Sequence, residues 1–138
     1  MKKLVAAALF VGSMQANAGT FTGTDFSGSY DCTGNDQHDG KFKGTITLQL
    51  VRAQSNGEYG SYNLTFEAEG FGGYTGYAAA HGTHMALQFA NKDLSTKDYG
   101  NSIVTFSKTK SDKWQFESFY YEPEYYGGNF GSETCVMR

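Results

Sequence analysis

The stretch Phe26-Ser27-Gly28-Ser29-Tyr30-Asp31-Cys32 has the alternation of a β-strand and ends in one of the two cysteines of the chain. Phe26, Tyr30 and Cys32 fall on one face, because side chains along a strand point to opposite sides in turn. The other cysteine is Cys135. A bond between the two would tie an early strand to a late one and close the structure that lies between them.

The first eighteen residues have the features of a secretory signal peptide. Lys2 and Lys3 precede an apolar run, Leu4–Val11, and Ala16-Asn17-Ala18 has the small-x-small pattern of a signal-peptidase site. The run is well short of the ~20 residues that span a bilayer, and no other segment predicts a membrane span. We expect export to the periplasm or to the outside, cleavage after Ala18, and one domain over residues 19–138.

The expected mature chain is acidic. Without Lys2 and Lys3, nine basic residues face fourteen acidic ones, which gives a net charge of −5. This balance argues against a nucleic-acid partner, whose binding depends on Lys and Arg contacts to phosphate. In an oxidising compartment two cysteines in a small domain usually pair, and here only one pairing exists.

Eight segments alternate between apolar and polar residues and are separated by turn residues. The clearest is Tyr59–Glu69, in which Tyr62, Leu64, Phe66 and Ala68 share one face. The expected strands are Asp25–Thr33, Phe42–Arg52, Tyr59–Glu69, Tyr74–Ala80, His84–Ala90, Ser102–Lys108, Lys113–Tyr121 and Gly131–Met137.

This pattern predicts an all-β fold, an eight-stranded antiparallel up-and-down β-barrel closed by one disulfide between its first and last strands. Closing the sheet removes the two exposed edges that an open sheet would leave. A two-sheet sandwich is the alternative, but it needs Greek-key crossovers, and most connections here are too short for them.

Alternate connections of a meander lie at the same end of the barrel. Three long ones, Gly34–Lys41, Asn91–Asn101 and Glu122–Phe130, would lie together at one end. Because loops on a rigid scaffold commonly carry function, we expect the site there. Cys32 and Cys135 should lie near the same end, at the base of the last loop.

The segment Phe119–Phe130 is unusually rich in tyrosine and glutamate. Tyrosine is favoured where an apolar body and a polar tip meet a partner. The segment could fold over the barrel mouth as a plug or form a contact surface. The predicted binding residues are Tyr120, Tyr121, Glu122, Glu124, Tyr125 and Tyr126, together with Asp36, His38, Asp39 and Tyr99 from the other two long loops.

Patterns for metal binding and catalysis are incomplete. The loop Gly34–Gly40 has potential oxygen ligands but lacks EF-hand spacing. His81 and His84 are too few for zinc. There is no Gly-x-Ser-x-Gly motif and no cysteine left over after pairing. We therefore predict no catalytic residue, no metal and no cofactor, with an envelope glycan-acting enzyme using Glu122 or Glu124 as an alternative.

Gly28-x-Tyr30 on the first strand of an eight-strand meander resembles the Gly-x-Trp of the calycin-like barrels, the lipocalins and avidins, with Tyr in place of Trp. Tyr30-x-Cys32 with a late cysteine also resembles the small periplasmic barrels that inhibit lysozymes. The first resemblance implies a small ligand in the barrel mouth, and the second implies a lysozyme-type glycosidase as the target.

Together these features predict an exported, monomeric, non-catalytic binding barrel. Its long-loop end would contact a partner or cover the mouth of a small-ligand cavity. The expected partner is an unknown small apolar or aromatic ligand, or a basic protein. Inhibition of a lysozyme-type glycosidase is the main alternative, because an acidic surface would attract such a basic target.

Overall fold

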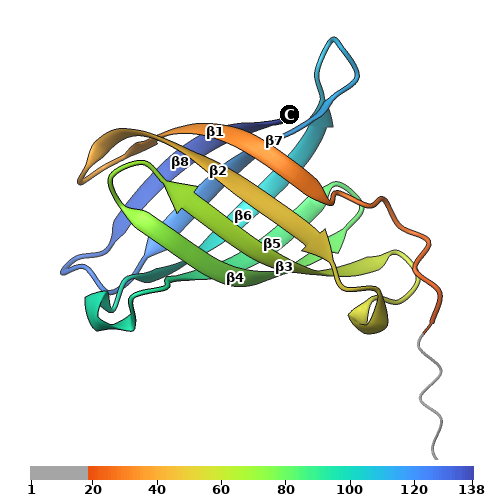
Figure 1. Cartoon of the computed structure of the whole chain (residues 1–138), viewed down its shortest axis with the longest axis horizontal. Coiled ribbons are helices and arrows are strands. Elements are labelled where there is room, and N and C mark those ends of the chain that lie inside the picture. Colours follow the sequence, from red (N-terminus) through yellow and green to blue (C-terminus); the bar gives the residue numbers. More distant parts are fainter. Residues whose placement is uncertain (1–18) are drawn as a thin grey trace, which may run out of the picture.

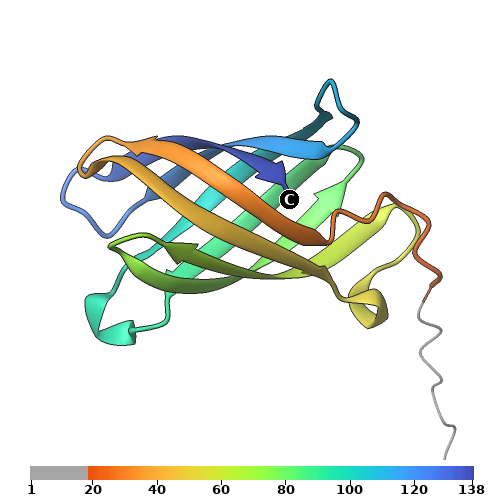
Figure 2. The same ribbon diagram turned by 45° about the horizontal axis from the view of Figure 1, so that its top comes forward.

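The computed structural model describes residues 19–138, so the predicted signal peptide lies outside the described residues. Eight antiparallel strands follow one another around a closed barrel, with β8 pairing back to β1 (Figures 1 and 2). The strands are β1 (Gly28–Asp36), β2 (Gly40–Leu50), β3 (Tyr59–Ala68), β4 (Gly72–His81), β5 (His84–Asn91), β6 (Tyr99–Lys108), β7 (Trp114–Glu122) and β8 (Asn129–Met137). The predicted barrel is confirmed, and the two-sheet sandwich is wrong.

Two 3-10 turns, η1 (Arg52–Gln54) and η2 (Leu94–Thr96), interrupt the connections. Neither of these helical segments of residues 19–138 is long and apolar enough to cross a membrane.

The alternation seen in the sequence separates the inside of the barrel from the outside. In β3, Tyr62 and Leu64 are buried, while Asn63 between them and Thr65 after them are exposed. Residues of this kind from all eight strands form one core. Each strand therefore has one apolar and one solvated face, as expected for an antiparallel sheet wrapped around a single interior.

The predicted disulfide joins Cys32 on β1 to Cys135 on β8. The two residues face each other directly in the strand register, with Cα atoms 4.0 Å apart, and both are buried. Their position along the barrel differs from the prediction, because β1 continues to Asp36 and β8 already begins at Asn129. The bond therefore lies in the middle of the seam and not at the base of the last loop.

One end of the barrel is filled by aromatic side chains, and we call it the plugged end. Phe26 precedes β1 and stacks on Phe106, with ring centroids 3.9 Å apart, and it forms a T-shaped pair with Trp114, with ring centroids 5.0 Å apart. The Phe26 backbone N–H donates to the Tyr62 hydroxyl, and its carbonyl accepts from the Tyr30 hydroxyl. Phe26 thus closes the barrel from outside the strands, although we expected it within the first strand.

Several strand ends also lie beyond their predicted positions. Because neighbouring strands supply backbone partners on both sides, polar residues such as Asn35 and Asp36 continue β1 instead of forming a loop. The first and last of the three long connections shrink to residues 37–39 and 123–128, while residues 51–58 form the longest connection, at the plugged end. The prediction that three long loops gather at one end is therefore wrong.

Candidate functional site

A cavity of about 330 Å³ opens at the end opposite Phe26, and we call this the cavity end. The connections β1–β2, β3–β4, β5–β6 and β7–β8 surround it, on the left of Figure 1. Aromatic and aliphatic side chains form its wall, and carboxylates line it together with them. The barrel is therefore filled at one end and hollow at the other.

Five aromatic side chains form a closed ring around this cavity, and we call them the aromatic collar. Each comes from a different strand and contacts two others. The distances between ring centroids are 6.3 Å for Phe42–Phe66, 5.9 Å for Phe66–Tyr74, 5.9 Å for Tyr74–Phe89, 6.2 Å for Phe89–Tyr120 and 6.2 Å for Tyr120–Phe42. All five line the cavity.

Glycines provide the space that the collar needs. Four collar rings lie over a glycine of a neighbouring strand: Phe42 over Gly34, Phe66 over Gly44, Phe89 over Gly100 and Tyr120 over Gly131. A Cβ atom at Gly34 would lie 2.2 Å from the Phe42 ring, and one at Gly131 would lie 2.2 Å from the Tyr120 hydroxyl oxygen. The rings can therefore lie against the barrel wall and leave its centre open.

Asp36 holds the loops together around the mouth. Its carboxylate accepts hydrogen bonds from the Tyr120 hydroxyl at 2.7 Å, from Asn129 Nδ2 at 2.9 Å, and from the backbone N–H groups of His38 and Asp39 at 2.7 and 2.9 Å. Burial acts to raise the pKa of Asp36, but these hydrogen bonds outweigh it and keep the pKa below its usual value. Asp36 is thus an ionised anchor whose acceptor sites are already occupied.

Asp98, Glu122 and Glu124 form a second group, which we call the acidic triplet. One oxygen atom of each lies within 4.8 Å of the others. Asp98 Oδ2 accepts from the Tyr74 hydroxyl at 2.7 Å, and Glu124 Oε1 accepts from the Tyr99 backbone N–H at 3.2 Å. The remaining oxygens, Asp98 Oδ1 and Glu124 Oε2, are buried and have no hydrogen-bond partner within residues 19–138.

Burial raises the pKa of Glu122 to about 7. The hydrogen bond from Asn129 acts in the opposite direction, while the negative charges of Asp98, Asp36 and Glu124 add to the rise. Burial and the neighbouring carboxylates also raise the pKa of Tyr125, to about 12. The carboxylates therefore give the mouth of the cavity a negative electrostatic potential.

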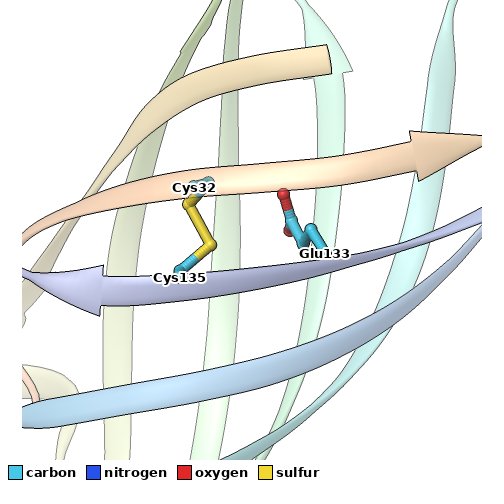
Figure 3. A group of neighbouring side chains, drawn as sticks. All are labelled: Cys32, Glu133 and Cys135. Atoms are coloured by element: carbon cyan, nitrogen blue, oxygen red, sulfur yellow. A yellow bond between two sulfur atoms is a disulfide. The ribbon is translucent and has the colours of Figure 1, made fainter. Parts of the chain in front are cut away.

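Glu133 lies deeper in the cavity, on the inner face of β8 two residues before Cys135 (Figure 3). Burial raises the pKa of Glu133 to about 7, and a hydrogen bond from Ser118 only partly opposes the rise. The cavity lining within residues 19–138 contains no Lys, Arg or His. The hollow end of the barrel therefore concentrates acids and provides no basic side chain to pair with them.

The ten predicted binding residues fall into two groups. Seven lie at the cavity or against its rim: Asp36, Asp39, Tyr120, Glu122 and Tyr125 line the cavity, Glu124 belongs to the acidic triplet, and His38 packs on Tyr125 with ring centroids 5.4 Å apart. The side chains of Tyr99, Tyr121 and Tyr126 are exposed on the outside.

The two neighbouring tyrosines of the β7–β8 connection point in opposite directions. Tyr125 turns inward and covers part of the mouth, whereas Tyr126 projects fully into solvent. Glu122 and Glu124, considered together as an acid pair, do meet, in the company of Asp98.

Sequence reasoning missed Glu133, Asn129 and the phenylalanines of the collar as site residues. Glu133 could have been found, because the period-two alternation from Cys135 places it on the inner face of the same strand. The collar could not, because its five members lie on five strands and meet only when the barrel closes.

His81 and His84, considered above as possible zinc ligands, belong to no cluster of three potential metal ligands within residues 19–138. His81 and His84 are exposed and face each other across β4 and β5. Within residues 19–138 the clusters of three potential metal ligands are the acidic triplet and Cys32–Glu133–Cys135, and the two cysteines of the latter are bonded to each other.

The barrel is compatible with a calycin-like fold, as the eight antiparallel strands and their closure show. Comparison of the chain with protein-family models, with curated proteins and with solved structures finds no match.

Proposed function

We propose that this protein is an exported, non-catalytic binding barrel of calycin-like type, whose cavity holds a small ligand. The ligand would enter between the loops of the cavity end, with Tyr125 covering part of the mouth. The observation that carries the proposal is the open-mouthed cavity inside the aromatic collar, because backbone glycines let the rings lie against the barrel wall and leave a hollow lined by rings, aliphatic side chains and carboxylates.

The size and lining of the cavity support this function. Ligand sites are concave and largely apolar, with a few polar groups in fixed positions, and span about 300–1,000 Å³. A cavity of about 330 Å³ lies at the small end of this range. The disulfide supports export to an oxidising compartment, because such bonds persist there, and the predicted signal peptide supports it as well.

Native mass spectrometry of the protein purified from its host tests the proposal. We expect a retained small molecule in the wild type. Ala68→Trp should lose it, because Ala68 lines the cavity and an indole there would fill the space. Thr65→Trp is the matched control, since Thr65 lies on the same strand but points outward.

Equal retention by both variants would place the bound molecule outside the cavity and contradict the proposal. A wild-type protein that carries no molecule and binds none from a host extract would contradict it as well.

Inhibition of a lysozyme-type glycosidase is the second candidate. Tyr126 favours it, because a fully exposed tyrosine at the tip of a loop beside several carboxylates is suited to contact a basic protein. Here the cavity would be incidental, and the outer surface of the β7–β8 loop would carry the interaction.

A lysozyme turbidity assay tests this candidate directly. A molar excess of the protein without residues 1–18 should slow lysis, and the effect should weaken with salt because charges steer the encounter. Tyr126→Ala should relieve the inhibition, whereas Tyr77→Ala, which removes an exposed tyrosine from the outer wall, should not. Lysis at an unchanged rate in the presence of wild-type protein would eliminate this candidate.

A further inference from the structure

The geometry points to an organic cation with an alkylated ammonium head as the ligand of the cavity, held inside the aromatic collar and neutralised by the carboxylates above and below it. This inference rests on the proposed function, namely that the cavity binds a small molecule. It adds the chemical class of that molecule.

The collar has the dimensions of an aromatic cage. Its ring centroids are spaced 5.9–6.3 Å apart. Five points with this spacing on a regular pentagon would each lie about 5 Å from its centre, inside the ~6 Å over which a ring attracts a cation. Phe42 and Tyr120 lie close over backbone glycines, so both rings sit against the barrel wall and line the cavity.

Hydrogen bonding strengthens two members of the collar as cation receptors. The Tyr74 hydroxyl donates to Asp98, and the Tyr120 hydroxyl donates to Asp36. A phenol that donates to a carboxylate becomes richer in electron density, and the attraction between a ring and a cation grows with that density. The carboxylates thus act on the cation directly through their charge and indirectly through the rings.

Acids flank the collar on both sides. The acidic triplet lies at the mouth, and Glu133 lies one rung below Tyr120, beside Ser118 on the inner wall. No Lys, Arg or His of residues 19–138 lines the cavity. Burying carboxylates without a basic partner is costly, and the raised pKa values of Glu122 and Glu133 reflect that cost. A cation bound between them would relieve the same cost and keep them ionised.

Two buried oxygens provide a separate indication. Asp98 Oδ1 and Glu124 Oε2 are enclosed and accept no hydrogen bond from residues 19–138. A bound divalent metal could use them, but the collar rings offer it only the Tyr74 and Tyr120 hydroxyls, which already donate to Asp98 and Asp36. The combination of rings and carboxylates favours a weakly hydrated organic cation, because alkyl groups on nitrogen pack against rings while the charge meets the acids.

Isothermal titration calorimetry with choline tests the inference, and 3,3-dimethyl-1-butanol is the matched probe, since it replaces the charged nitrogen by carbon at the same size. We expect choline to bind to the wild-type protein about tenfold or more tightly than the neutral alcohol. CaCl₂ alone is the third probe and is expected to show no binding that choline displaces.

Variants locate the site. Phe89→Leu removes one ring of the collar and should weaken choline binding by about fivefold to thirtyfold while leaving the alcohol nearly unaffected. Phe66→Leu provides the same test from β3 if Phe89→Leu does not fold. Phe119→Leu is the control, because Phe119 lies next to Tyr120 but is half exposed on the outer face.

The possible outcomes separate this inference from the proposed function. Binding of the alcohol as tight as that of choline, abolished by Ala68→Trp, would overturn the cation and leave the small-ligand barrel standing. Calcium binding that excludes choline would overturn the organic cation in favour of a metal. Absence of choline binding at millimolar concentration would also overturn the inference, and together with no retained molecule in native mass spectrometry it would remove the proposed function too.

Discussion

Cys32→Ala/Cys135→Ala is expected to lower the free energy of unfolding by about 4–5 kcal/mol. The bond joins residues 103 positions apart, so it restricts nearly the whole unfolded chain. The loss approaches the total stability of many small domains, which is about 5–15 kcal/mol. Urea denaturation followed by tyrosine and tryptophan fluorescence measures it.

Reduction of the wild-type disulfide is the matched control and should produce the same loss. Hydrogen exchange should show which strands open first, and we expect the amides of β1 and β8 to lose protection before those of β4, because the bond lies in the β1–β8 seam. A loss below about 1 kcal/mol would mean that the unfolded chain is already confined without the bond.

Glu133→Gln is expected to stabilise the protein, and only at neutral and alkaline pH. The folded protein holds the pKa of Glu133 at about 7, above its ordinary value of 4.5, because the carboxylate is enclosed by the barrel. Between these two values the folded state binds more protons than the unfolded state, so stability falls as the pH rises from 4.5 through 7. The difference between the two pKa values corresponds to a loss of about 3 kcal/mol in the free energy of unfolding above pH 7. The uncharged amide of Gln should recover this loss.

Urea denaturation at pH 4.5 and pH 8 measures this difference. Glu133→Gln should resemble the wild type at pH 4.5 and exceed it at pH 8. Glu122 titrates over the same range in both proteins, so the comparison isolates Glu133. Glu117→Gln is the control, because Glu117 is exposed on the outer face of β7 and should change stability by less than about 0.5 kcal/mol. A gain or loss of the same size at both pH values would contradict the assigned protonation.

The disulfide and Glu133 have opposite expected effects on the stability of the barrel. The disulfide is expected to stabilise the barrel as a whole, whereas the raised pKa of Glu133 predicts that this residue lowers stability at neutral pH. A residue that lowers stability inside a cavity is typical of a functional site. If Glu133→Gln gains stability and also weakens choline binding, a purely structural role for Glu133 is excluded.

Much of the fold could be predicted because it depends on local information. Alternation in β3 separates its inner and outer residues whatever the other strands do, as Tyr62 and Asn63 illustrate. The pairing of Cys32 with Cys135 follows from there being only two cysteines. Strand ends were less predictable, since Asp36 belongs to β1 only because β2 and β8 both pair with it.

The candidate site could be predicted only in part. Asp36, Glu122 and Tyr125 were expected at the functional end, and they do line the cavity. Their roles were not predictable, because the acceptor sites of the Asp36 carboxylate are filled by Asn129 and Tyr120, which lie far away along the chain. Whether Tyr125 or Tyr126 turns toward the cavity depends on how the β7–β8 connection folds over the closed barrel.

The sequence by itself determined an eight-stranded meander with two-faced strands and one possible disulfide, because alternation and the cysteine count are properties of the chain. Only the tertiary structure decided that Phe26 plugs one end, that the other end is hollow, and that five aromatic rings surround the hollow. Those features depend on which residues of different strands fall at the same level of the barrel. That level is set by the hydrogen-bond register of closure, which no single strand contains.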